Sequence, residues 1–345
     1  MVAAIVIRES RMRPVRQNWF PALACLVPVM LFAVSRTDYA NYVAYTADGD
    51  IVSYSRGFSY ATRTGFVLYM TSVAHERVFL AMHWLYANLG FSLSDSMLAN
   101  SMMMIAAYFF YASRQCNNVL LGALATVAFI MLPWFEQLGQ NTLRQGFSLI
   151  FILAFFRAVN YRQKRWAVLF AALAIGSHYS AALFVSVYIL TDFLPRSGKL
   201  FVAVVVLTFV GYVTDYITVL SGMIVTPILL WTGLYTQYST NAFLTYQVGY
   251  KALFFYYSLF QCVVSVLLLH KAEKQSDARL AKYCIVMTVI YMAASGLPYY
   301  NRVAMMPMLL LPVVVVTLCS RITLPRWGLR SMLDPGNYPF LRRVG

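Results

Sequence analysis

Long apolar runs alternate with short polar segments along most of the chain. The first run extends from about Trp19 to Ser35, and further runs are centred near residues 105, 126, 152, 172, 187, 209, 260, 290 and 311. A membrane-spanning helix needs roughly 20 mostly apolar residues. The pattern therefore predicts an all-α, polytopic integral membrane protein with about ten transmembrane helices, organised as a single transmembrane domain over residues 1–345.

Two polar stretches, residues 36–96 and 219–250, are too long to be simple turns and are the predicted outer loops. Within the first, residues 78–91 are apolar but too few to cross a bilayer, which predicts a re-entrant or interfacial helix. The run from Trp166 to Leu194 is instead too long for one crossing, at about 43 Å as a helix. Two short helices meeting at His178 are the expected solution.

Composition excludes a water-soluble enzyme. Only 11% of the residues are charged and 61% are hydrophobic, whereas soluble domains carry about 25% charged residues. The five cysteines are scattered without CxxC spacing or a nearby histidine cluster, so we expect neither a disulfide framework nor a zinc site. No metal site and no cofactor are predicted.

The net charge of +15 has a predicted sidedness. If the N-terminus is inside and residues 78–91 do not cross, 20 of the 27 Lys and Arg residues lie inside with 5 of the 12 acids. The whole excess then faces the cytoplasm, as the positive-inside rule requires. Both termini are expected to be cytoplasmic. The basic tail, residues 321–345, should contact anionic lipid and no nucleic acid.

Four arginines between residues 8 and 16 precede the first apolar run, a pattern that also fits a signal sequence. The run is long enough to remain as a membrane anchor instead. We expect the anchor, because the spanning pattern continues downstream.

Several polar residues collect at the predicted outer ends of the spans: Arg36, Asp38, Asp48, Asp50, Glu76, Glu136, Arg144, His178 and Arg302. Ionisable groups at membrane depth are expensive, so this convergence indicates a functional site. Arg144 lies between Asn141 and Gln145 at a helix start, where a guanidinium can bind phosphate through two hydrogen bonds. Snorkelling to the interface is the alternative for Arg144.

His178 and Glu76 also have two interpretations each. His178 is either a structural side chain bonded across helices or a catalytic one. Glu76 either caps the helix that follows it and pairs with Arg77, or acts as a carboxylate base. Arg302 places a cation at the mouth between two spans.

The motifs Ser35-Arg36-Thr37-Asp38-Tyr39-Ala40-Asn41-Tyr42, Glu76…Phe79, Asn141…Arg144-Gln145 and His178-Tyr179-Ser180-Ala181 follow one another in an order that resembles the EpsG family of membrane polysaccharide polymerases. The resemblance covers about residues 35–195, and beyond it only the alternating spans and Arg302 agree. The chain departs from the family pattern at Arg36, where glycine is usual, and at Ser148, where a small alanine is usual.

The resemblance implies a metal-independent glycosyltransferase of the bacterial cytoplasmic membrane, related in role to the Wzy O-antigen polymerases. It would join polyprenyl-diphosphate-linked repeat units into O-antigen, capsule or exopolysaccharide on the outer face. Membrane lipids, a flippase and a chain-length regulator are the further partners implied. The implied base is His178, Glu76 or Asp38, and the implied diphosphate- and glycan-binding residues are Arg144, Gln145, Arg302, Arg36 and Asn141.

Other functions share parts of this pattern. An O-antigen ligase or a polyprenyl-phosphate-sugar glycosyltransferase also places acids and arginines on an outer loop. A lipid-linked oligosaccharide flippase should instead line a mid-membrane cavity with charge, and the absence of an internal repeat counts against it.

Overall fold

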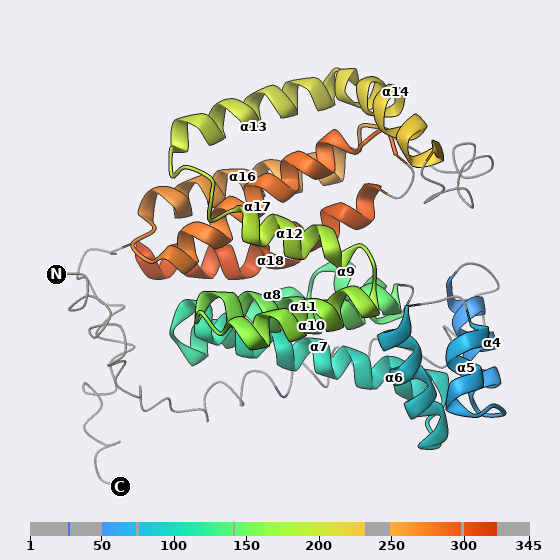
Figure 1. Cartoon of the computed structure of the whole chain (residues 1–345). Helices are drawn as coiled ribbons and strands as arrows, with labels where there is room; N and C mark the ends of the chain where they lie inside the picture. The colour runs from blue at the N-terminus through green and yellow to red at the C-terminus, as the bar shows by residue number, and fades with distance from the viewer. Residues whose placement is uncertain are drawn as a thin grey trace, which may run out of the picture.

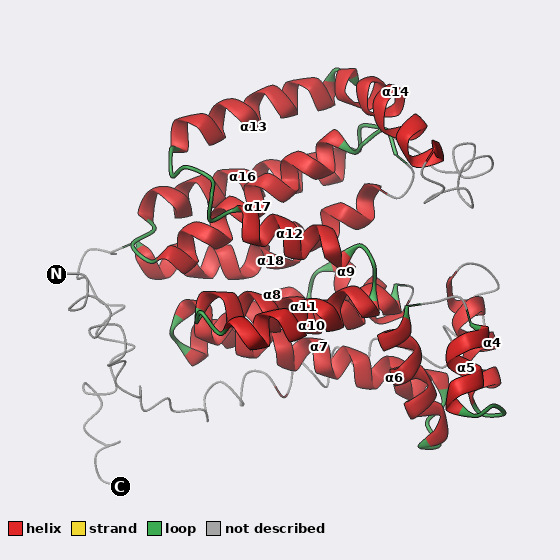
Figure 2. Cartoon of the chain, in the orientation of Figure 1, coloured by secondary structure: helices red, strands yellow, loops and turns green. Residues whose placement is uncertain are grey.

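A computed structural model describes residues 50–73, 76–140, 142–231, 249–297 and 300–322, together with Val27. All regular secondary structure within these residues is helical (Figure 2). The helices are α4 (Asp50–Ala61), α5 (Phe66–Ser72), α6 (Arg77–Asn88), α7 (Leu93–Cys116), α8 (Val119–Ile130), α9 (Pro133–Gln140), α10 (Leu143–Asn160), α11 (Lys164–Ser177), α12 (Ala181–Leu190), α13 (Gly198–Val213), α14 (Tyr216–Trp231), α16 (Ala252–Lys271), α17 (Gln275–Ala293) and α18 (Tyr300–Arg321).

The long helices lie roughly side by side in a layered bundle (Figure 1). Helices α7, α8, α10 and α11 form one part, α16, α17 and α18 pack together beside it, and α13 lies against α16 and α17. One continuous core of buried apolar side chains joins these parts. The shorter helices α4, α5 and α6 are grouped at one end of the bundle.

Three of the described helices, α10, α16 and α18, are long and apolar enough to cross a membrane. Two further spans result if α8 with α9, and α13 with α14, each count as one span; the helices of these pairs are bent against each other by 72° and 87°. Each predicted span centre from residue 105 onward lies in a helix. The described residues confirm the prediction of an all-helical protein with membrane-spanning helices. The count of ten spans is not confirmed. The orientation of the termini remains a prediction.

The interruption at His178 is confirmed. Helix α11 ends at Ser177 and α12 begins at Ala181, with His178 in an extended conformation between them. The short apolar segment after Glu76 is also helical, as α6, and its location in the membrane interface remains a prediction.

The α4–α6 unit, residues 50–88, has a small apolar core of its own. Tyr54, Phe79 and Leu80 are buried there against residues at the starts of two long helices, Leu93 of α7 and Leu143 of α10. This shared core fixes the beginning of α6 beside the beginning of α10. Polar residues at those two positions are therefore brought close together.

Helices α7 and α8 approach closely at Gly122. A Cβ added at Gly122 would lie 2.6 Å from the backbone N and Cα of Ser113. We expect Gly122→Ala to lower the melting temperature of the detergent-solubilised protein, because overpacking costs about 1–3 kcal/mol. Gly222→Ala is the control, since an added Cβ there meets nothing within 4 Å. Equal melting temperatures for the two variants would contradict the close approach.

Candidate functional site

The carboxylate of Glu76 joins two of the predicted site residues. Its Oε2 lies 3.0 Å from Nη1 of Arg144, and its Oε1 lies 2.9 Å from Nδ1 of His178. The backbone N–H of Tyr179 also donates to Oε1, at 3.4 Å. The Glu76 side chain is 4% exposed, and the side chains of Arg144 and His178 are each 17% exposed. The site is therefore a largely buried ion pair with two partly accessible members.

Three separate elements position these side chains. Glu76 is the residue before α6, Arg144 lies in the first turn of α10, and His178 follows the last residue of α11. The end of α11 reaches the start of α6 because Gly176 has no side chain. A Cβ added at Gly176 would lie 2.6 Å from Cγ2 of Val78.

The carboxylate of Glu76 is held ionised. Burial alone would raise its pKa, but the hydrogen bond from His178 and the charge of Arg144 outweigh burial and hold the pKa of Glu76 at about 2. A carboxylate with so low a pKa has little tendency to take up a proton at neutral pH. Glu76 is therefore suited to holding its partners in place.

The ionised carboxylate also determines the tautomer of His178. A carboxylate only accepts hydrogen bonds, so Nδ1 of His178 must carry the proton in their contact. The neutral ring then has its lone pair on Nε2, and the described residues place no hydrogen-bond partner on that atom. His178 can accept a proton at Nε2 from a bound substrate.

Tyr54 is a member of the site that the sequence analysis missed. Its hydroxyl accepts a hydrogen bond from Nε of Arg144 at 3.3 Å. Ile51, Tyr54 and Phe58 share the spacing of one buried helix face, which is a signal for burial but not for this partner.

Gln145 joins the start of α10 to the start of α18. Its Nε2 donates to the backbone carbonyl of Arg302 at 2.9 Å. The reverse orientation of the amide would set two acceptors against each other, so Oε1 must face away. Oε1 is buried and has no hydrogen-bond partner among the described residues. The side-chain oxygen of Gln145, the residue after Arg144, is thus a buried acceptor without a partner among the described residues.

One expected contact is not formed. The predicted alternative paired Glu76 with Arg77, but Nη1 of Arg77 donates to the carbonyl of Val73, and the Glu76 side chain makes no capping hydrogen bond to α6. Adjacent residues at a helix start point in different directions, so the more distant Arg144 is the better partner. Arg36, Asp38 and Asn141 lie outside the described residues, and their predicted roles remain predictions.

The fold and the site define an all-helical membrane protein that collects a carboxylate, an arginine and a histidine at one end of its bundle. The EpsG family model matches residues 18–327, so the chain belongs to the EpsG family. No curated protein and no solved structure shows significant similarity to it. Membership indicates a role in membrane polysaccharide polymerisation, with glycosyltransferase-like chemistry.

Proposed function

We propose that the protein polymerises polyprenyl-diphosphate-linked oligosaccharide repeat units into O-antigen, capsule or exopolysaccharide at the outer face of the bacterial cytoplasmic membrane. The family supplies the class of reaction. The observation that carries the proposal is the single carboxylate of Glu76 holding both Arg144 and His178. A cation for a diphosphate and a base for a hydroxyl are the two groups that this reaction needs.

The reaction transfers a growing glycan from its lipid diphosphate to a sugar hydroxyl of a new lipid-linked repeat unit. The hydroxyl oxygen forms a bond to the anomeric carbon of the donor, and the bond from that carbon to the diphosphate oxygen breaks. The hydroxyl proton passes to Nε2 of His178. The departing polyprenyl diphosphate keeps the bonding electron pair, and its added negative charge is stabilised by Arg144.

Within this proposal Glu76 is a positioning residue and His178 is the base. Glu76 fixes the ring of His178 through Nδ1, an arrangement that orients a histidine base in other enzymes. The low pKa of Glu76 argues against its acting as the base itself. Asp38, a further candidate base, stays a prediction.

The first turn of α10 suits the diphosphate. Thr142, before the helix, makes no capping hydrogen bond with its side chain, which leaves the first backbone N–H groups of α10 without that partner. Free N–H groups and the helix dipole attract phosphate, and Arg144 adds a full charge. The side-chain oxygen of Gln145, unpaired among the described residues, accepts hydrogen bonds only, so in this scheme its partner is a sugar hydroxyl and not the diphosphate.

The test of the function is the length of surface polysaccharide in a strain that lacks the gene. We expect single repeat units without long polymer, and restored polymer when the wild-type gene is supplied. Polymer that persists in the deletion strain would overturn the proposal. Polymer that accumulates on the lipid carrier would also overturn it, in favour of ligation.

The phosphate-binding role of Arg144 is tested by replacing it with lysine. Arg144→Lys keeps the charge but loses the planar fork, and we expect polymerisation to slow about 30-fold, the equivalent of roughly 2 kcal/mol for hydrogen bonds to a charged group. The control is Arg56→Ala, because Arg56 is exposed on α4. Wild-type polymer length with Arg144→Lys, at equal membrane expression, would contradict a phosphate-binding role.

A further inference from the structure

We propose that Tyr54 is a positioning residue of the polymerase, and that its hydroxyl sets which edge of the Arg144 guanidinium faces the lipid diphosphate. The inference rests on the proposed function. It adds a residue from α4, 90 positions away from Arg144 in the sequence.

The position of the Tyr54 hydroxyl is fixed by packing. Tyr54 is 1% exposed, and its ring lies against the rings of Phe79 and His83, with centroids 5.5 Å and 6.4 Å away. Both of these residues belong to α6, the helix that begins just after Glu76. Because the α6 side chains pack against the ring of Tyr54, its hydroxyl has little freedom to move. Tyr54 and Glu76 are thus two anchors presented by one packed unit.

The two anchors take different atoms of the guanidinium. Nε–H donates to the Tyr54 hydroxyl, and Nη1 donates to Glu76. One anchor alone would leave the guanidinium free to rotate about the contact, whereas two anchors at different atoms fix its plane. The fixed plane is a consequence of Tyr54 and Glu76 acting together on Arg144.

The anchors also determine what remains for substrate. A guanidinium has five N–H donors, and it can grip phosphate along the edge that contains Nε or along the edge formed by its two terminal nitrogens. Tyr54 occupies Nε, so the first edge is closed. Two N–H groups of Nη2 and one of Nη1 remain, and the described residues place no partner on Nη2. The terminal nitrogens of Arg144 therefore face the diphosphate.

The variant Tyr54→Phe removes the hydroxyl and keeps the aromatic ring. The centroid of that ring lies 5.9 Å from Cζ of Arg144. We expect about a 10-fold fall in kcat with little change in KM, because the lost orientation matters most when charge develops on the leaving diphosphate. The assay uses purified protein and the lipid-linked repeat units that accumulate in the deletion strain. Tyr86→Phe is the matched control, since the Tyr86 hydroxyl of the same unit donates to Asn100 instead.

A double variant separates positioning from folding. Lysine at position 144 has no Nε–H for the tyrosine to hold, so Tyr54→Phe should have almost no further effect on an Arg144→Lys protein. An equal loss in both backgrounds, or an equal loss in Tyr86→Phe, would overturn the positioning role. If Tyr54→Phe has wild-type kcat while Arg144→Lys is impaired, the role of Tyr54 fails and the proposed function stands. If Arg144→Lys is unimpaired, the failure lies in the proposed site itself.

Discussion

Glu76→Gln is expected to lower the rate of polymerisation by about 100- to 1,000-fold, which lies within the roughly 10²- to 10⁴-fold contribution of a general base. The amide is nearly isosteric with the carboxylate but has no charge to hold Arg144. Its NH₂ group also cannot accept the Nδ1 proton of His178, so the ring can change tautomer and present an N–H to the substrate. Single-turnover assays with lipid-linked repeat units measure this loss directly.

Titration of Glu76 itself should make no contribution to the pH dependence of the wild-type rate between about pH 5 and 8. The pKa of the native carboxylate is held at about 2, so Glu76 is ionised throughout that range. Because this pKa is lowered by folding from 4.5, the carboxylate stabilises the folded protein above pH 4.5, and this stabilisation is lost as the pH falls towards 2.

Two further variants complete this experiment. Glu76→Asp keeps the charge on a shorter side chain and should recover part of the lost rate. Glu273→Gln, at an exposed acid between α16 and α17, should behave like the wild type. A Glu76→Gln protein that keeps more than half of the wild-type rate would contradict the idea that this carboxylate organises the site.

The break at His178 could be predicted from the sequence because it follows from length alone. An apolar run of about 43 Å does not fit one crossing of the bilayer, and polar residues interrupt it at a single place. The gathering of Glu76, Arg144 and His178 could also be anticipated, because a topology with few loops places span ends on a common face. Such arguments locate residues at an end of the bundle but do not pair them.

Pairing could not be predicted because it depends on packing between distant segments. Glu76 lies 68 residues from Arg144 and 102 residues from His178, whereas Arg77 is its neighbour and was the natural candidate. Tyr54 resembled any buried aromatic residue of an amphipathic helix. Only the shared core of the α4–α6 unit with α7 and α10 brings these side chains together.

The number of spans was hard to predict for a related reason. Hydropathy summed over a window detects apolar length, but not a change of direction within it. Helices α13 and α14 meet at Asp215, a residue with a positive φ of 55°, and their axes differ by 87°. A similar sharp bend separates α8 from α9. Hydropathy alone therefore predicts a simple crossing near residues 126 and 209, where the structure has bent helix pairs.

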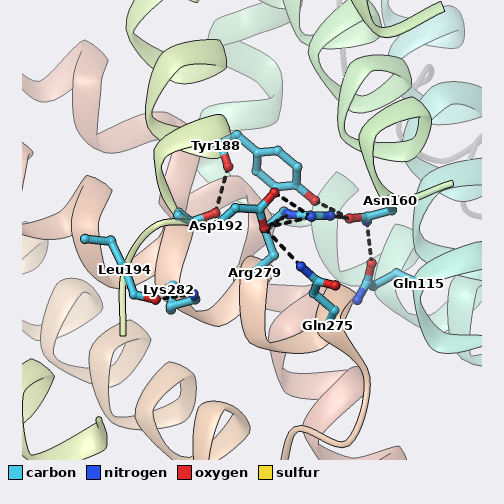
Figure 3. A network of polar contacts seen from close by, with 9 residues as sticks. Gln115, Asn160, Tyr188, Asp192, Leu194, Gln275, Arg279 and Lys282 are labelled. Carbon is cyan, nitrogen blue, oxygen red and sulfur yellow. Dashed lines mark hydrogen bonds and ion pairs between the residues drawn. The ribbon is translucent and has the colours of Figure 1, made fainter. Parts of the chain in front are cut away.

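A second polar network lies at the opposite end of α10, where Asn160 is about 24 Å from Arg144 along the helix axis. Arg279 of α17 donates from Nε and Nη2 to the two carboxylate oxygens of Asp192, both at 2.8 Å. Its Nη1 donates to the side-chain oxygen of Asn160, which also accepts from the Tyr188 hydroxyl (Figure 3). Asn160 continues the network to Gln115 of α7. The network therefore connects the helices α7, α10, α12 and α17.

The two partners of this ion pair should respond unequally to truncation. The Arg279 side chain is 8% exposed and that of Asp192 is 34% exposed. Asp192→Ala leaves a buried guanidinium that cannot lose its proton, with Asn160 as its remaining partner. Because Asp192 is one-third exposed, the cost should be below the roughly 3 kcal/mol of breaking a fully buried pair. Arg279→Met leaves a carboxylate that water can reach, so its loss should be clearly smaller. Melting temperatures in detergent, followed by size-exclusion chromatography, measure both variants.

The comparison needs a control for the loss of negative charge. Glu273→Ala removes an exposed acid between α16 and α17 and should leave the melting temperature near that of the wild type. The double variant Asp192→Leu with Arg279→Met should be more stable than Asp192→Ala alone, because no buried charge is left without a partner. If Arg279→Met is as damaging as Asp192→Ala, packing of the arginine stem and not its charge governs this end of the bundle. If both variants match Glu273→Ala, the network does not stabilise the fold.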